Sequence, residues 1–187
     1  MNNGIAMSKR QEIIRSAAII VYREGAAKLT LAAVAKEAGI SKGGLLYHFP
    51  NKDSLIQAMV TELMDQFAEN LERRVESDPN PQGRWCRAYA QEVFTHFGEL
   101  MESNAGLLAA VSNDQEKLQP VRERYSMWMK RMEQDGTDRI ASIIIRLAAD
   151  GLKFNALFGI PTVQGEERMQ VMEALLLATG QMEDERN

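Results

Sequence analysis

The chain contains 187 residues with a net charge of −4, and 45% of them are hydrophobic, which excludes a disordered chain and allows one sizeable core with an appended head. Its single cysteine, Cys86, excludes an internal disulfide framework and fits a reducing compartment. No apolar run approaches the roughly 20 residues of a membrane span, and the N-terminus does not resemble a signal peptide, so we expect a cytoplasmic protein.

The first predicted helix follows a short lead, residues 1–7, which we expect to be disordered. Ser8 and Gln11 have the spacing of a capping box, in which each side chain bonds to the other residue's backbone N–H. The helix then extends to about Glu24, and Gly25 ends it. Its apolar face is formed by Ile13, Ile14, Ala17, Ile20 and Val21.

The next stretch predicts two short helices that meet at a sharp corner. Thr30 can cap the first and Ser41 the second, because a hydroxyl oxygen can accept a hydrogen bond from an unpaired backbone N–H. Gly39 supplies the left-handed residue between them. On the second helix, Leu45 and Phe49 lie four residues apart and are expected to face the core. The pattern is that of a helix-turn-helix.

The outward face of the second short helix has the chemistry of a surface that enters the DNA major groove. A lysine can reach a phosphate or a guanine, two glycines allow close approach, and a tyrosine hydroxyl is a common phosphate donor. A surface aromatic without a partner is the alternative for the tyrosine. The residues expected to contact DNA from this helix are Ser41, Lys42, Gly43, Gly44, Leu46 and Tyr47.

This region resembles the DNA-binding head of the TetR family of bacterial transcriptional repressors, over roughly residues 8 to 60. The resemblance implies an all-α fold, a homodimer on a palindromic double-stranded DNA operator, and release by a small-molecule effector. One position departs: Leu46 stands where the family most often has tyrosine, so we expect contact with a thymine methyl or a sugar there. The matching residues are Thr30, Val34, Ala35, Ala38, Gly39, Ile40, Ser41, Lys42, Gly43, Leu45, Tyr47, His48, Phe49, Lys52 and Leu55.

Five further side chains are candidates for holding DNA phosphates. Lys9, Arg10, Thr30 and Lys52 lie at helix starts, where exposed N–H groups also attract anions. The resemblance implies that His48 donates to a phosphate. The alternatives are core packing for His48, capping alone for Thr30, and solvated charges for Lys9 and Arg10.

Charge is divided unevenly along the chain. Residues 1–60 hold eight Lys and Arg and four Asp and Glu, which gives this part a net charge of +4. Because the whole chain has a net charge of −4, the remaining residues carry −8. A basic head on an acidic body would direct phosphate contacts to one end of the molecule.

A long helix is predicted from Lys52 to about Ser77, and it would link the head to the body. At 1.5 Å per residue it would be about 39 Å long. Residues 78–83, which are rich in Pro, Asn and Gly, form the clearest loop of the chain. The apolar residues that recur every four positions along the helix are Leu55, Met59, Leu63, Phe67, Leu71 and Val75.

Helices fill the remainder of the chain, and no strand pattern occurs. Pro120 either kinks its helix or marks the first turn. Gly136 ends that helix, and Thr137 is expected to cap the following one. The expected helical ranges, in order, are about 84–102, 107–111, 115–135, 138–158 and 166–181.

The resemblance implies an effector cavity among the middle helices, whose methionine and aromatic side chains could adapt to a ligand. An ordinary packed core is the alternative. His96 and Asn104 are polar residues that could orient a ligand, and the acidic body favours a cationic one. The candidate lining residues are Phe67, Phe94, Phe97, Met101, Tyr125, Trp128, Met129, Met132, Phe154 and Asn155.

The last two helices carry more apolar surface than one packed face requires. The resemblance implies that they form a four-helix dimer interface with a second copy, and burial within the chain is the alternative. Gly151 costs about 1 kcal/mol relative to alanine in mid-helix, so it would permit a close helix approach. The residues expected at the interface are Ile143, Leu147, Gly151, Met172, Leu175 and Leu176.

Catalysis has little support in the sequence. Cys86 and His96 are ten residues apart, so a helix would turn them about 80° away from each other. Two His and one Cys are too few for a typical structural zinc site. We therefore expect no enzyme, no cofactor and no metal.

The predicted organisation is a lead over 1–7, a helix-turn-helix domain over 8–52, and an effector-binding and dimerisation domain over 53–187. The predicted function is that of a sequence-specific transcriptional regulator, a repressor. The alternative is a helical ligand-binding or protein-interaction module without specific DNA recognition.

Overall fold

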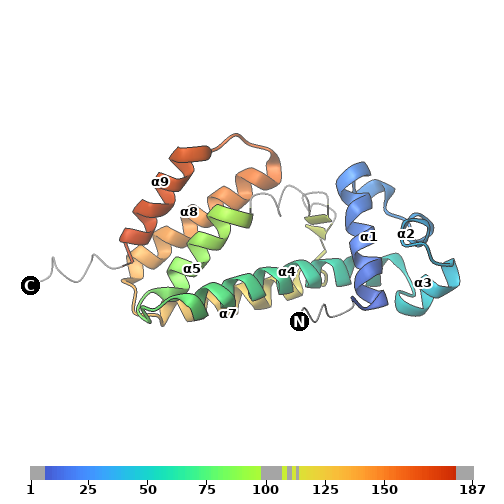
Figure 1. Cartoon of the computed structure of the whole chain (residues 1–187), viewed down its shortest axis with the longest axis horizontal. Helices are drawn as coiled ribbons and strands as arrows, with labels where there is room; N and C mark the ends of the chain where they lie inside the picture. Colours follow the sequence, from blue (N-terminus) through green and yellow to red (C-terminus); the bar gives the residue numbers. More distant parts are fainter. Residues whose placement is uncertain (1–6, 98–106, 109–110, 113, 180–187) are drawn as a thin grey trace, which may run out of the picture. The chain divides into compact units, whose positions relative to one another are not determined.

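The computed structural model describes residues 7–97, 107–108, 111–112 and 114–179, with only the backbone of 96 and 97. The described residues are helical and contain no strand, as predicted (Figure 1). They belong to two compact units. The head unit comprises Met1–Leu63 with Gly106–Gln119, and the body unit comprises Met64–Ala105 with Pro120–Asn187.

The head begins with α1 (Lys9–Glu24), which has the predicted capping box. The Gln11 N–H donates to Ser8 Oγ at 3.3 Å, and the Ser8 N–H donates to Gln11 Oε1 at 3.0 Å. The five apolar residues predicted for this helix are all buried. A single 3-10 turn, η1 (Ala26–Lys28), leads from it towards the next helix.

The corner of the helix-turn-helix forms as predicted between α2 (Leu31–Glu37) and α3 (Lys42–His48). Thr30 Oγ1 accepts from the Ala33 N–H at 3.1 Å, and Ser41 Oγ accepts from the Gly44 N–H at 3.0 Å. Gly39 has φ +63°, a conformation that side chains with a Cβ rarely adopt. Within the head, α1 packs on α2 and α2 packs on α3.

Helix α4 (Lys52–Ser77) has the predicted bounds and contributes residues to both units. Asn51 Oδ1 caps it by accepting from the Ser54 N–H at 2.7 Å. All six residues of the predicted apolar stripe are buried, from Leu55 to Val75. The recurrence of apolar residues every four positions was therefore sufficient to predict both the helix and the face that it buries.

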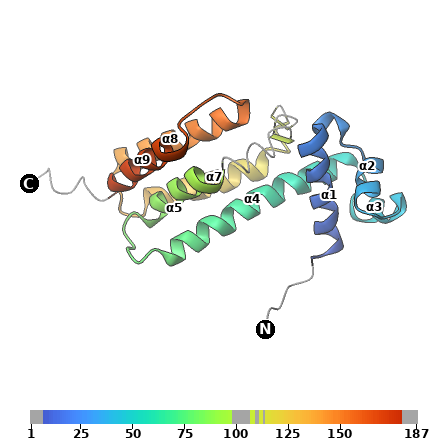
Figure 2. The ribbon, with the colours of Figure 1, turned by 45° about the horizontal axis from the view of Figure 1, so that its top comes forward.

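The body consists of the second part of α4 with α5 (Arg84–Glu92), α7 (Gln119–Glu133), α8 (Arg139–Phe158) and α9 (Gly165–Leu177). Helix α5 packs on α8 and α9 (Figure 2). The helix predicted over 84–102 changes at residue 93 into a π-helical segment, η2 (Val93–Phe97). Pro120 lies in the first turn of α7, where no N–H is required.

Two aspartates cap helices of the body, and one of them corrects a prediction. Asp138, not Thr137, caps α8: its Oδ1 accepts from the N–H groups of Ile140 at 2.9 Å and Ala141 at 3.2 Å. Helix α5 begins after Gly83, which has no side chain to cap it. Asp135 supplies the missing acceptor, because its Oδ2 accepts from the Cys86 N–H at 2.9 Å.

The loop over 78–83 is closed by one guanidinium. Arg87 Nε donates to Asp78 Oδ2 at 2.8 Å, and its Nη atoms donate to the carbonyl oxygens of Asn80 at 2.7 Å and Gln82 at 2.8 Å. The hydrogen bond from Arg87 holds the pKa of the Asp78 carboxyl below its usual range. The loop therefore depends on an ionised Asp78.

We expect Asp78→Asn to lower the free energy of unfolding by about 1 kcal/mol at pH 7, because water screens the ion pair on its open side. The folded pKa of Asp78 lies below the unfolded value, so this stabilisation is present above about pH 4 and disappears as the pH falls through the folded pKa. Urea unfolding at pH 7 and pH 3 measures the difference. Glu76→Gln, which changes an exposed carboxylate of the same unit, should alter neither value.

Candidate nucleic-acid interface and ligand site

Helix α3 presents the predicted residues on one outward face. Leu45 is fully buried, and Phe49, which follows the helix, is 1% exposed, so these two residues fix which side of α3 points into the head. Lys42, Gly43, Gly44 and Leu46 are exposed, and Tyr47 is 86% exposed. A Cβ on Gly43 would meet only Ser41 Oγ, at 3.9 Å, so neither the backbone angle nor the packing requires glycine there.

Two aromatic contacts organise the end of this face. Tyr47 and His48 meet edge to face with ring centroids 5.2 Å apart, and His48 is half-buried. The Arg10 guanidinium lies over the Phe49 ring, 5.1 Å from its centroid. Arg10, at the start of α1, is thereby held beside the C-terminal end of α3, which favours a shared surface over an isolated solvated charge.

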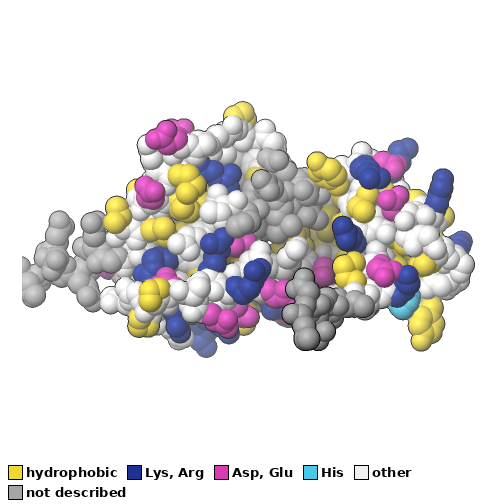
Figure 3. All heavy atoms as spheres, viewed as in Figure 1, with side chains coloured by type: hydrophobic (Ala, Val, Ile, Leu, Met, Phe, Trp, Pro, Cys, Tyr) yellow, Lys and Arg dark blue, Asp and Glu magenta, His cyan; other side chains and the backbone are white. Residues whose placement is uncertain are grey.

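The remaining phosphate candidates are exposed at helix starts. Lys9 pairs with Glu12 in the first turn of α1, and Thr30 uses its hydroxyl oxygen as a cap. Lys52 opens α4 and is exposed. The hydroxyl hydrogen of Thr30 and the ammonium groups remain available as donors to an anion. Figure 3 shows Lys and Arg side chains spread over the visible face of α1, α2 and α3.

Sequence reasoning missed one ion pair of the head unit. Lys117 Nζ lies 3.0 Å from Asp53 Oδ1, in the first turn of α4, and also pairs with Asp114. The pair ties the segment that precedes α7 to the helix start where Lys52 lies. Lys117 is separated from Asp53 by more than 60 residues, so no local pattern indicates it.

The predicted effector residues differ in burial, and some lie outside the part of the chain that the structure describes. Phe67, Trp128 and Met132 are buried together with Phe94, and the Phe67 and Trp128 rings lie 4.8 Å apart. Tyr125 and Met129 are half-buried beside them on α7. The side chain of Phe97, and Met101 and Asn104, lie outside the described residues, as does the His96 ring.

Phe154 and Asn155 do not join this cluster. Phe154 is 55% exposed and stacks on Phe158, with centroids 4.6 Å apart. Asn155 lines a separate pocket between α8 and α9. Helix α8 carries the two residues away from the face that packs on the aromatic core, because that face is formed by Ala149, Leu152 and Lys153.

A polar cluster that the sequence did not indicate adjoins the aromatic residues. Tyr89 OH donates to Asp150 Oδ1 at 2.8 Å, and Tyr125 OH donates to the same oxygen at 3.0 Å. Lys153 Nζ lies 2.6 Å from Asp150 and donates to both tyrosine hydroxyls. The ammonium also lies 4.7 Å and 4.4 Å from the centroids of the Tyr89 and Tyr125 rings.

Burial determines the electrostatics of this cluster. It lowers the pKa of the Lys153 ammonium well below the usual value and raises the pKa of the Asp150 carboxyl. Burial, followed by the neighbouring Asp150 charge, raises the pKa of Tyr89. The cluster therefore holds polar groups that respond to any added charge, inside an otherwise apolar core.

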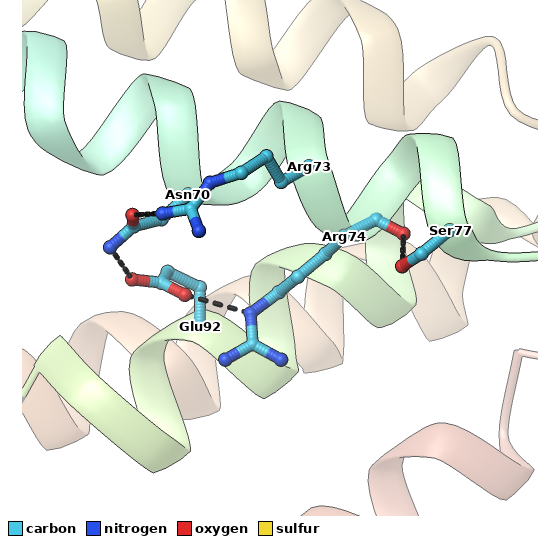
Figure 4. A pocket seen from close by; sticks show the side chains of 5 residues that line it. All are labelled: Asn70, Arg73, Arg74, Ser77 and Glu92. Carbon is cyan, nitrogen blue, oxygen red and sulfur yellow. Dashed lines mark hydrogen bonds and ion pairs between the residues drawn. The ribbon is translucent and has the colours of Figure 1, made fainter. Parts of the chain in front are cut away.

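Two further pockets of the body are lined in part by charged residues. One, of about 350 Å³, is lined by both Met129 and Ile143, which were predicted for different sites. The other, of about 370 Å³, lies where α4 faces α5 (Figure 4). There the buried Glu92 accepts from Asn70 Nδ2 at 2.8 Å and Arg74 Nε at 2.7 Å. Arg74 Nη2 also donates to Thr95 Oγ1 at 2.8 Å, so this cluster joins α4 both to the end of α5 and to η2.

The predicted dimer residues differ in exposure. Leu147 is 60% exposed and Gly151 is exposed, whereas Ile143, Leu175 and Leu176 are half-buried. Met172 is only 7% exposed and is already covered by its own chain. A Cβ on Gly151 would meet nothing within 4 Å, so none of the described helices approaches it closely.

An apolar stripe runs along the outer face of α8. Its members recur at helical spacing, and the apolar side chains among them are 51–62% exposed. Met169 and Leu177 of α9 are also exposed, and Figure 3 shows hydrophobic side chains over α8 and α9. A contiguous exposed apolar surface of this kind marks an interaction site. The stripe consists of Ile140, Ile144, Leu147, Gly151, Phe154 and Phe158.

The described part of the chain does not favour metal binding, thiol chemistry or membrane insertion. No group of three His, Cys, Asp or Glu residues there could hold a metal ion. Cys86 is fully buried, and burial raises the pKa of its thiol to about 11, so it is not a poised nucleophile. None of the described helices is long and apolar enough to cross a membrane.

Comparison with known proteins identifies both parts of the chain. Residues 13–59 match the family of bacterial regulatory proteins called the tetR family, and residues 83–180 match the tetracyclin repressor-like C-terminal domain. The transcriptional regulator TtgR of Pseudomonas putida is 38% identical over 77 residues, 40% of this chain and 37% of TtgR. The nicotine-responsive repressor HdnoR of Paenarthrobacter nicotinovorans is 31% identical over 98 residues, 52% of this chain and 48% of HdnoR. The matches thus span less than half of the length of each of these two relatives.

Solved structures share the fold over nearly the whole chain. A TetR-family regulator from Rhodococcus sp. has a TM-score of 0.68 at 16% identity and covers 91% of this chain and 96% of its own. The multidrug-binding protein EbrR, in complex with malachite green, has a TM-score of 0.64 at 21% identity over 92% and 99% of the two chains. These likenesses concern the fold.

We expect Tyr89→Phe to lower the free energy of unfolding by about 1–2 kcal/mol, because it removes a buried hydroxyl that bonds Asp150 and receives Lys153. Urea unfolding followed by circular dichroism measures the loss. Tyr22→Phe, at a tyrosine that is 69% exposed, should change stability by less than about 0.5 kcal/mol. Equal effects of the two substitutions would contradict a stabilising role for the cluster.

Proposed function

Because the chain belongs to the TetR family of bacterial regulatory proteins, we propose that it is a sequence-specific transcriptional regulator, a repressor that binds a palindromic operator as a homodimer. The observation that carries the proposal is the outward face of α3. Lys42, Gly43 and Tyr47 of α3 are exposed, and the core contacts are made instead by Leu45 and by Phe49 directly after the helix, so the exposed residues are not needed to fill the core.

The proposed DNA contacts divide by role. Ser41, Lys42, Gly43, Gly44, Leu46 and Tyr47 enter the major groove, where Leu46 offers an apolar contact in place of a hydroxyl. Lys9, Arg10, Thr30, His48 and Lys52 hold phosphates, which position the head without reading sequence. A regulator of this kind acts where the DNA is, so we place it in the cytoplasm, without a cofactor and without catalytic activity.

The proposed dimer uses the apolar stripe of α8 with the exposed residues of α9. A second copy would cover the stripe, and the open space above Gly151 would admit the partner's helix. We assign Phe154 to this interface rather than to the effector cavity, because its ring lies on the outer face. Two heads would then reach successive major grooves, about 34–36 Å apart.

The proposed effector site is the aromatic and polar cluster of the body, formed around Phe67, Tyr125 and Trp128 with Tyr89 and Lys153. Helix α4 belongs to both units, so a change in its position within the body would also move the head. A ligand that binds more tightly to the arrangement of α4 found in DNA-free protein would therefore shift the equilibrium towards release of DNA. Glu92 and Arg74 couple α5 to the same helix. HdnoR is described as nicotine-responsive and EbrR as a multidrug-binding protein in complex with malachite green, and both descriptions support ligand-dependent release.

The experiment that tests the function is selection of bound duplexes from a random library, followed by titration of the selected duplex at several salt concentrations. A regulator should select a palindrome and bind it at least about 1,000-fold more tightly than random DNA. Weak binding of every duplex with the same steep salt dependence would instead favour a ligand-binding module without specific recognition.

We expect Gly43→Ala to separate stability from recognition. The added Cβ meets no strained contact, and alanine favours a helix by about 1 kcal/mol over glycine, so the head should become more stable. The same methyl occupies the face that approaches the groove, so affinity for the selected operator should fall about tenfold or more. Binding to random duplex should not change, because no charge is altered. Unchanged operator affinity would contradict the proposal that this face of α3 contacts the operator.

We expect Leu147→Glu to convert the dimer to a monomer, since each copy would bury an unpaired carboxylate in the centre of the apolar stripe. Light scattering during size exclusion measures the mass. Tyr22→Glu places the same charge on an exposed residue of α1 and should leave the mass unaltered. A Leu147→Glu protein that remains dimeric would place the interface elsewhere.

A further inference from the structure

A cavity of about 280 Å³ lies where α8 turns into α9, apart from the aromatic cluster of the body. This volume equals the space of about nine water molecules, so it suits a ligand of about that many heavy atoms. Most of its wall is apolar. The apolar side chains are Leu152, Ala156, Ile160, Pro161 and Val163.

Arg168 is the one charged residue among the described residues that line this cavity. Its Nη2 donates to the Val93 carbonyl oxygen at 3.1 Å, in the π-helical segment. Its Nε is buried, and none of the described residues accepts a hydrogen bond from it. A buried donor without an acceptor is costly and rare in folded proteins. Arg168 is therefore expected to donate to a ligand that occupies the cavity.

The surroundings of Arg168 reinforce the need for an anion. The residue lies in the first turns of α9, whose N-cap, Gln164, forms no side-chain cap. The N–H groups there are therefore not satisfied by the cap, and the helix start carries partial positive charge. Glu166 and Glu167 of the same turn are exposed and do not line the cavity. Asn155, on the α8 wall, adds an amide donor.

We propose that this cavity binds a small organic acid, with its carboxylate on Arg168 and Asn155 and its apolar part against the α8–α9 wall. A guanidinium matches a carboxylate with two parallel N–H donors, whereas a compact ammonium would offer a point charge only. The apolar wall favours a monocarboxylate over inorganic phosphate, which would leave that wall without a partner. The site is distinct from the proposed effector cluster and does not depend on DNA binding.

Calorimetric titration of the full chain, without DNA, tests the site with benzoate as the probe. Benzoate should bind with a Kd on the order of 0.1–1 mM, as expected for a ligand of this size. Benzyl alcohol, which has the same ring without the charge, should bind at least about tenfold more weakly, and so should inorganic phosphate. Equal binding of benzoate and benzyl alcohol would overturn the proposal, as would no binding of benzoate.

Two variants locate the binding. Asn155→Asp keeps the shape of the side chain but places a carboxylate beside Arg168, so benzoate binding should fall at least about tenfold while the fold is preserved. Arg168→Met should abolish binding, and Arg122→Met, at an exposed arginine of α7, should not alter it. Because Arg168→Met also removes the bond to Val93, the Asn155→Asp result decides the outcome. Wild-type affinity in Asn155→Asp would overturn the proposal.

Discussion

The uninterrupted apolar stripe of α4 is the constraint on which the remaining structure depends. Its six residues, four apart from Leu55 to Val75, are all buried, and they extend through residues of both compact units. A polar residue at any of these positions would leave one unit without part of its core. The head and the body are therefore joined by a helix that each of them needs for its own packing, which makes α4 the physical route between them.

Helix α3 illustrates how packing frees a surface for recognition. Seven residues are too few for an isolated helix to be stable in water. Helix α3 is stabilised instead by the burial of Leu45 and Phe49 and by the cap from Ser41. The outward residues contribute nothing to that stability, so their chemistry is set by what they contact outside the chain. The same reasoning explains why Leu46 can replace a polar residue without harm to the fold.

The body places charged groups where burial makes them costly. Glu92 is 1% exposed and accepts hydrogen bonds from two residues of α4, and Lys153 is 7% exposed and donates to tyrosines of α5 and α7. Such groups are stable only while every partner remains in place. A ligand that changes one partner therefore changes the balance of the whole cluster, which suits a domain whose proposed role is to respond to small molecules. Arg168 differs, since no described residue accepts a hydrogen bond from its Nε.

The sequence by itself determined most of the helices, the caps of α1, α2 and α3, and the composition of the outward face of α3, because these depend on residues at most four apart. It did not determine which side of α8 faces the core, since that helix is apolar on more than one side. Only the tertiary structure turned Ile140, Leu147 and Phe154 outward and Lys153 inward. Likewise, Asp135 caps α5 from 49 residues away. Contacts between distant segments follow from how all the helices pack at once, and periodicity within one helix carries no information about its partners.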